Sequence, residues 1–316
     1  MCGIVGYLDR KSDGQGYVGE AILGMLQALE CRGPDSAGVA LFAKAQDHGF
    51  VVRVKLGGEG SERKLSEMAG AVTTMGSYAR FLVEDSADPK KLTARIERLD
   101  PEFEVVSIGR ELEIVKQVGS PGNLEATYGI SKMRGTHGIG HTRLSTESRV
   151  DLSHSQPFWA HGYPDLAIVH NGHITNYHQL RRRYEQRGVK FYTENDSEII
   201  AIYLGERLSE ENDLEKSLRC MLRDLDGSYS CVVATATELA FVKDPYALKP
   251  MLVAETDTFV ALANEEVAIR ARFPGDYRVR EADVKEVRVW RNSTAPAGRS
   301  GRSTPGFASW VKSIFW

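Results

Sequence analysis

The chain begins MCGIVGY, which places Cys2 directly ahead of small and β-branched residues. The initiator methionine is normally removed when the second residue is as small as cysteine, and its removal leaves Cys2 with a free α-amino group beside its thiol. Such an amine has an intrinsic pKa of about 7.7–8.0, so at neutral pH it can accept a thiol proton without a histidine. Cys2 is therefore a candidate nucleophile. The plainer alternative is an apolar strand that buries a small cysteine.

Four later stretches carry polar residues that could serve such a nucleophile. They are RGPDSAG at residues 32–38, GHTR at 140–143, HNG at 170–172 and NDSE at 195–198. Together with CGIVG at 2–6, and in this order, they resemble the motifs of the class II glutamine amidotransferases, the N-terminal-nucleophile hydrolases that release ammonia from glutamine. Each motif is weak alone, but the set is specific. The resemblance covers roughly residues 1–56 and 136–270.

The resemblance implies a role for each motif in hydrolysing the side-chain amide of glutamine. Cys2 Sγ would attack while its own α-amino group acts as general base. The oxyanion would lie between the Asn171 side-chain amide and the Gly172 backbone N–H, and losing one such donor commonly costs about 10²–10³ in rate. Arg143 has the planar fork that suits the substrate α-carboxylate, and Asp196 would face the α-ammonium.

These residues also have plainer structural roles. An Asn-Gly pair such as 171–172 is common in turns, and Arg143 could form a structural ion pair. Asp196 comes one residue before a helical run, where it would serve as an N-cap, a role that is compatible with binding substrate. Arg32 and Asp35 are expected to fix the loop near the nucleophile rather than to contact glutamine.

The segment after Arg143 departs from the family pattern. Hexosamine-synthesising and purine-synthesising members usually read tryptophan-alanine-threonine-histidine-glycine there, whereas this chain reads LSTES at 144–148. Thr146 is kept, and the resemblance implies that it binds substrate. The histidine is lost, which changes how the glutamine carboxylate is held.

The histidines support a rival hypothesis from another class. Seven of the eight fall within 137–178, and the spacings His137-x3-His141 and His170-x2-His173 could suggest a metal hydrolase. The two glycines inside the first pair favour a strand or loop, where helical spacing would not bring the rings together, so no metal site is expected. A third hypothesis is a catalytically silent regulatory subunit that has kept the fold and binds glutamine without turnover.

Composition and charge narrow the classes of partner. The chain has 316 residues, 42% of them hydrophobic, and a formal net charge of −3, so no basic field favours nucleic acid. Its four cysteines show no CxxC spacing, which favours reduced thiols and a cytoplasmic protein. No uninterrupted apolar run approaches the ~20 residues that a membrane span needs. Composition favours a small molecule or another protein as the partner, and the resemblance implies glutamine and synthase subunits.

Hydrophobic periodicity predicts two sheets covered by helices. A helix over 18–31 follows the N-terminal strand, and residues 51–56 are expected to pair as a hairpin with a strand at 37–42. The later elements are helices at 177–187, 197–208 and 214–225, then strands at 228–235, 239–242, 250–254 and 258–263. The absence of β-α-β-α alternation argues against a doubly wound sheet. Together with the resemblance, this predicts an α+β fold for 1–290, a four-layer αββα sandwich of the N-terminal-nucleophile hydrolase type.

Residues 57–135 interrupt this pattern and are expected to form a small inserted α/β lobe that ends in a Gly/Pro-rich turn at 119–123. With this lobe, the chain most resembles the stand-alone amidotransferase subunits of glutamate-synthase-like and N-methylglutamate-synthase-like complexes. The resemblance implies that synthase subunits on other chains accept the ammonia. No cofactor is expected on this chain, which has neither a cysteine cluster nor a dinucleotide fingerprint; flavin and iron–sulfur clusters would be on the partner subunits.

The C-terminal part is expected to stand apart from the domain. Residues 291–306 are rich in Ser, Pro, Gly and Arg and are predicted to be a flexible linker. Residues 307–316 are predicted to be an amphipathic docking tail for a partner subunit. Its apolar residues share one helical face and are Phe307, Trp310, Val311, Ile314 and Phe315. The alternatives are packing on its own domain and weak membrane attachment.

Overall fold

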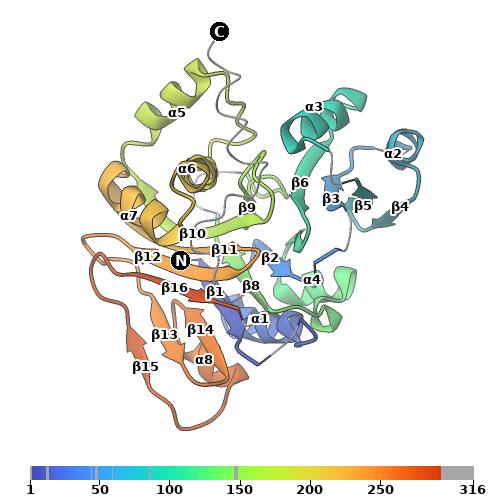
Figure 1. Cartoon of the computed structure of the whole chain (residues 1–316). Coiled ribbons are helices and arrows are strands. Elements are labelled where there is room, and N and C mark those ends of the chain that lie inside the picture. Colours follow the sequence, from blue (N-terminus) through green and yellow to red (C-terminus); the bar gives the residue numbers. More distant parts are fainter. Residues whose placement is uncertain are drawn as a thin grey trace.

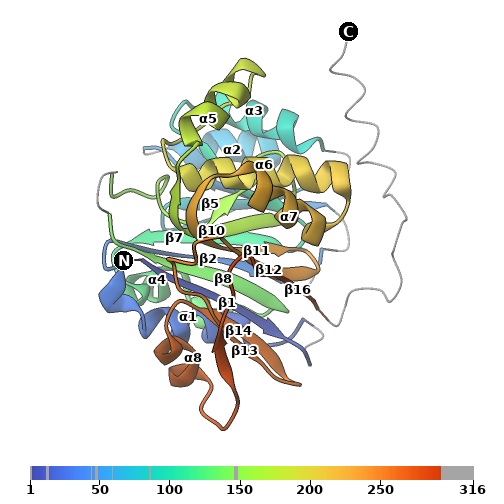
Figure 2. The ribbon, with the colours of Figure 1, turned by 90° about the vertical axis from the view of Figure 1, so that its left-hand side faces the viewer.

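The computed structural model describes residues 2–11, 14–43, 45–46, 49–58, 60–84, 87–145 and 149–292. The main body consists of two antiparallel sheets that lie face to face, with helices on the outer side of each (Figures 1 and 2). The predicted four-layer αββα sandwich is therefore confirmed. No helix in the described part of the chain is long and apolar enough to cross a membrane.

The first sheet has seven strands and holds the N-terminal strand in its interior. Its order is β15-β13-β14-β1-β8-β2-β7. The strands are β1 Gly3–Asp9, β2 Ser36–Phe42, β7 Leu112–Val118, β8 His137–Arg143, β13 Leu252–Glu255, β14 Phe259–Ala263 and β15 Val279–Glu281. The helices on its outer face are α1 Val18–Gln27, α4 Pro121–Tyr128 and α8 Glu266–Arg272 (Figure 2). Gly140 in β8 permits the close approach of α1, since a Cβ there would lie 2.9 Å from Ile22.

The second sheet has five strands, in the order β16-β12-β11-β10-β9. The strands are β9 Phe158–Trp159, β10 Leu166–Ile174, β11 Gly227–Thr235, β12 Glu238–Lys243 and β16 Val287–Arg291. The helices on its outer side are α6 Asp196–Glu211 and α7 Leu214–Asp224, and α5 Tyr177–Gln186 packs on α6. β10 pairs with β11 along its whole length, from Leu166↔Thr235 to Ile174↔Gly227. This pairing fixes the register of the strand that carries the HNG motif.

The inserted lobe is a four-stranded antiparallel sheet with two helices, in the strand order β4-β5-β3-β6. Its elements are β3 Phe50–Lys55, α2 Ser61–Ala69, β4 Val72–Met75, β5 Tyr78–Val83, α3 Pro89–Leu99 and β6 Glu104–Gly109. The hairpin predicted between 37–42 and 51–56 was wrong, because β2 pairs with β7 and β8 while β3 pairs with β5 and β6. All seven residues of β2 are buried. A strand of this kind has neighbours on both sides, and its own sequence does not specify them.

The lobe sheet begins and ends earlier than the expected bounds of 57–135. It takes in β3 at residues 50–55, whereas β7 belongs to the seven-stranded sheet. Glu113 of β7 joins the two, since its carboxylate lies 2.6 Å from Arg53 and 3.0 Å from Arg80 of the lobe.

Elements with strong local patterns lie within three residues of their predicted bounds, as in α5, α7, β11, β12 and β14. The helix expected over 18–31 ends at Gln27, and a 3₁₀ turn, η1 (Glu30–Arg32), follows it. The turn at 119–123 leads into α4, because Ser120 caps a helix that has proline in its first turn. The strand β16 runs to Arg291, the first residue of the predicted linker. Residues 293–316, with the predicted docking tail, lie outside the described residues.

Asp165 links the two sheets and gives a test of the fold. Asp165 lies in the turn between β9 and β10. Its carboxylate accepts hydrogen bonds from the backbone N–H groups of Arg110, Glu111 and Leu112, at 3.0, 3.0 and 2.9 Å. Replacing Asp165 with Ala leaves these donors without their acceptor, so we expect the free energy of unfolding to fall by about 2–3 kcal/mol in chemical denaturation. Asp257→Ala, in the exposed turn between β13 and β14, is the control. Equal stability of the two variants would contradict the assignment.

Candidate active site

Cys2 lies immediately before β1, where the two sheets meet. Its thiol is partly exposed, and the backbone N–H of Leu144 donates to Sγ at 3.3 Å. Pairing of β1 with β8 begins at Gly3, whose N–H donates to Thr142 Oγ1 at 3.1 Å. A Cβ at Gly3 would lie 2.5 Å from that oxygen, so glycine is required beside the cysteine. The sheet thus holds the residue after the candidate nucleophile and leaves the nucleophile at the strand end.

Two side-chain amides hold the carbonyl oxygen of Cys2. Asn171 Nδ2 in β10 and Asn264 Nδ2, just after β14, each donate to it at 3.1 Å. Asn264 Oδ1 in turn accepts from the backbone N–H of Ile4 at 3.0 Å. The sequence pointed to Asn171 but not to Asn264. The signal for Asn264 is a polar residue at the end of a buried strand, which is too common to single it out.

The Asn171-Gly172 pair lies inside β10 and not in a turn. It is opposite Ser230 and Tyr229 of β11. Gly172 has a φ of +135°, and a Cβ there would lie 2.0 Å from the carbonyl oxygen of Ser228. Both the backbone conformation and the space therefore require glycine at the position next to Asn171.

His141 contacts the Asn171 amide from the facing sheet. Its Nε2 is 3.3 Å from Asn171 Oδ1, and its side chain is buried. Burial lowers the pKa of His141 to about 3, and the nearby His170 and Arg143 shift it in the same direction. The ring is therefore neutral at physiological pH. Its Nδ1 has no hydrogen-bond partner among the described residues.

Arg143 ends β8 and is buried close to the nucleophile. Its Nη1 donates to the carbonyl oxygen of Arg149 at 2.8 Å. Burial lowers the pKa of Arg143, while the nearby Cys2, Asp151 and Asp35 act in the opposite direction. The guanidinium therefore lies within electrostatic reach of the thiol.

Asp35 and Arg32 contact segments that flank the site. Asp35 Oδ2 accepts from the backbone N–H of Ser145 at 2.7 Å, in the segment that follows β8. Arg32 forms an ion pair with Glu265, close to the end of β14. Their role in fixing loops near Cys2 stays a prediction, and these are the contacts through which they would act. Thr146, the remaining predicted site residue, lies outside the described residues.

Asp196 is the first residue of α6 and reaches back to β10. Its Oδ2 accepts from the backbone N–H of Ile174 at 2.9 Å, and its Oδ1 is 3.6 Å from His170 Nδ1. The helix begins one residue earlier than predicted. Asn195 is the N-cap in place of Asp196, since its side chain accepts from the Ser197 N–H at 3.0 Å. The Asp196 carboxylate is therefore not used for capping.

The histidine spacings that suggested a metal hydrolase have structural explanations. Among the described residues, no group of three or more histidine, cysteine or acidic side chains could hold a metal ion. His137 is fully buried, stacks on Phe42 and lies 2.7 Å from the carbonyl oxygen of Thr235. His170 lies 3.0 Å from the Ser197 hydroxyl at the start of α6.

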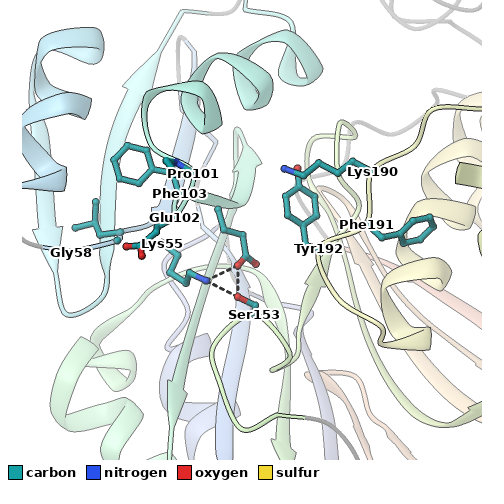
Figure 3. Close-up of a pocket in the computed structure, with 12 residues that line it drawn as sticks. Lys55, Gly58, Pro101, Glu102, Phe103, Ser153, Lys190, Phe191 and Tyr192 are labelled. Carbon is teal, nitrogen blue, oxygen red and sulfur yellow. Dashed lines mark hydrogen bonds and ion pairs between the residues drawn. The ribbon is translucent and has the colours of Figure 1, made fainter.

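A cleft of about 770 Å³ lies between the inserted lobe and residues 190–192 (Figure 3). On its wall, Lys55 Nζ is 2.9 Å from Glu104 Oε2 and 2.6 Å from Ser153 Oγ. None of the predicted site residues lines this cleft, so it is separate from the Cys2 site. Tyr192 on the cleft wall donates its backbone N–H to Glu198 of α6 at 2.8 Å.

Comparison with known proteins gives a matching family and relatives that align over nearly the whole chain. The family described as "Glutamine amidotransferase domain" matches residues 141–271. Glutamine amidotransferase-like protein GlxB of Rhizobium meliloti (strain 1021) is 33% identical over 306 residues, which cover 93% of this chain and 96% of the relative. A putative glutamine amidotransferase of Methanothermobacter thermautotrophicus is 34% identical over 308 residues, which cover 92% of this chain and 99% of the relative.

The fold is shared with a solved structure described as the allosteric regulatory enzyme of purine biosynthesis. That structure aligns with a TM-score of 0.61 and 20% identity, covering 91% of this chain and 46% of the other. This likeness concerns the fold, whereas the two relatives matched over nearly their full length establish the family. The chain belongs to the class II glutamine amidotransferases and is a glutamine-hydrolysing enzyme.

Proposed function

We propose that the chain converts glutamine to glutamate and ammonia through a thioester on Cys2 and delivers the ammonia to a synthase partner subunit. The observation that carries the catalytic part is the hydrogen bond from the Asn171 amide to the Cys2 carbonyl, because it joins the nucleophile to the predicted oxyanion residues. Family membership supports the substrate, and the geometry supports the assignment of residues.

The first half-reaction forms the thioester. Cys2 Sγ adds to the side-chain amide carbon of glutamine while the α-amino group of Cys2 takes the thiol proton. Asn171 Nδ2 and the Gly172 N–H stabilise the charge that develops on the amide oxygen. The C–N bond then breaks, and the α-ammonium returns its proton to the leaving nitrogen, which departs as ammonia. This role of the amine requires removal of Met1, since a peptide nitrogen is not a base.

The second half-reaction releases glutamate. A water molecule attacks the thioester carbon and gives one proton to the α-amino group of Cys2. The tetrahedral intermediate collapses with cleavage of the C–S bond, and the proton returns to the thiolate. Because the same oxyanion donors and the same base serve both halves, the site needs no second acid or base.

Arg143 and Asp196 would hold the charged groups at the amino-acid end of glutamine. The guanidinium fork would bind the α-carboxylate, and the Asp196 carboxylate, already fixed by Ile174, would bind the α-ammonium. Thr146 would add a hydroxyl contact. The two residues come from different elements. Arg143 ends β8, which pairs with the strand that follows Cys2, and Asp196 is bound to β10, which carries Asn171.

Ammonia would be used by synthase subunits on other chains, in a complex that resembles glutamate synthase or N-methylglutamate synthase. Any flavin or iron–sulfur cluster would be carried by those subunits. Family membership as a glutamine-hydrolysing enzyme leaves no place for the catalytically silent regulatory subunit, and measured turnover of glutamine by the purified chain checks this.

Replacing Cys2 tests the nucleophile. Cys2→Ala should lower glutamine hydrolysis by at least about 10³-fold, measured as glutamate release, while thermal unfolding stays unchanged. Cys31→Ala, which removes an exposed cysteine, is the control and should keep full activity. A diazoketone analogue of glutamine should label Cys2 and spare Cys31. Substantial turnover by Cys2→Ala would refute the thioester mechanism.

Two conservative variants test the contacts with substrate. Arg143→Lys keeps the charge but loses the fork, and Asp196→Asn keeps the shape but loses the charge. Each should raise the KM for glutamine by about 10–100-fold with little change in thermal unfolding. Arg182→Lys and Asp257→Asn, both exposed positions, are the matched controls. Wild-type kinetics in either test variant would mean that its contact is misassigned.

Isolation of the native protein tests the partner. The affinity tag should follow the C-terminus, because the α-amino group of Cys2 has to stay free. We expect synthase subunits to co-purify, and removal of residues 307–316 to weaken their recovery while leaving glutaminase activity intact. Recovery of the full-length chain alone, under conditions that preserve complexes, would count against a synthase partner.

A further inference from the structure

We propose that His141 is a positioning residue that fixes the orientation of the Asn171 side-chain amide. The inference rests on the proposed function, because it concerns the donor assigned to the oxyanion. His141 itself would not touch glutamine. It would act through Asn171, by keeping one amide N–H on the Cys2 carbonyl and the other free for the oxyanion.

His141 is placed for this role by the strand pairing of the seven-stranded sheet. It lies opposite Ile4 of β1 on one side and Gly38 of β2 on the other. Its side chain is 1% exposed and meets Asn171, which comes from the five-stranded sheet. A histidine in the interior of one sheet thus contacts an amide in the other.

The hydrogen-bond partners determine which way the amide and the ring must be arranged. The Cys2 carbonyl oxygen can only accept, so Asn171 must turn Nδ2 toward it, at 3.1 Å. Asn171 Oδ1 then faces His141 Nε2 at 3.3 Å, and that nitrogen must be the donor. We therefore assign the tautomer with the proton on Nε2. Turning the amide over would place two carbonyl oxygens against each other.

The state of the ring makes it a constant donor. A charged ring is disfavoured by burial and by the neighbouring Arg143 and His170, and the pKa of His141 is about 3. The neutral ring carries one proton, and Nε2 is the nitrogen that has an acceptor. Nδ1 has no partner among the described residues and can be a bare lone pair. His141 therefore keeps the same hydrogen bond across the pH range in which the enzyme would work.

The amide needs such a restraint because the terminal torsion of an asparagine is soft. Its Nδ2 carries two protons, one of which is used by the Cys2 carbonyl. The direction of the second follows from the plane of the amide, which Oδ1 and Nδ2 fix together when both are hydrogen-bonded. If the bond to Oδ1 were lost, the amide could rotate away from the oxyanion while still contacting Cys2. The expected effect is a lower kcat without a matching change in KM.

A matched pair of variants tests the inference. His141→Gln places an amide nitrogen near the position of Nε2, whereas the shorter side chain in His141→Asn does not reach it. We expect kcat to fall by about 10²-fold in His141→Asn and by no more than about fivefold in His141→Gln, with KM nearly unchanged in both. The control is His137→Asn, which alters another buried histidine of β8 and should reduce stability but not kcat. Equal kcat values in the two His141 variants would overturn the inference.

A double-mutant cycle with Asn171 separates positioning from general damage to the fold. In an Asn171→Ala background, His141→Asn should cost less than about threefold in kcat, because the amide it orients is gone. His137→Asn should show no such coupling. If the effects of His141→Asn and Asn171→Ala simply multiply, His141 does not act through Asn171. If Asn171→Ala keeps full activity, the oxyanion assignment itself fails, which is a separate outcome.

Discussion

The carbonyl oxygen of Cys2 is the point on which the arrangement depends. It accepts one amide from each sheet, Asn264 beside β14 and Asn171 in β10. Buried polar groups are costly unless they are paired, so these bonds hold the two sheets at a fixed distance where the chain begins. A strand end would otherwise fray, and a nucleophile on a frayed end could not be aimed. The same two bonds thus stabilise the terminus and orient the thiol.

Strand β10 extends this constraint to Asp196, the residue proposed to bind the amino-acid end of glutamine. Its Asn171 lies at the nucleophile, and three residues later the backbone of Ile174 holds the Asp196 carboxylate. Because β10 is paired with β11 throughout this stretch, from Asn171↔Ser230 to Ile174↔Gly227, the distance between these two points is fixed by the strand itself. α6 therefore begins at a place set by the sheet, and α6 carries Asp196. The spacing of 22 residues between Ile174 and Asp196 in the sequence contains no information about this contact.

The sequence predicted the parts of the fold that local patterns determine. Helical periodicity located α5 and α7. The motifs singled out Cys2, Arg143, Asn171 and Asp196 as proposed site residues, and of these Asn171 contacts Cys2. Pairing that depends on distant strands was not predictable in this way. β2 is buried throughout, and nothing in it distinguishes β3 from β7 as its neighbour. Asn264 was missed for a similar reason, since its importance arises from contact with a residue 262 positions away.

The start of the strand ladder also explains why an N-terminal residue suits this chemistry. Pairing of β1 with β8 begins at Gly3, so the nitrogen of Cys2 lies outside the pairing. A nitrogen outside the ladder keeps its lone pair available as a base. Gly3 sets this limit, because its N–H is bound by the Thr142 hydroxyl and a side chain there would collide with it. The fold therefore holds Cys2 by its carbonyl oxygen, and in the proposed mechanism its nitrogen and its sulfur are the atoms that would take part in the reaction.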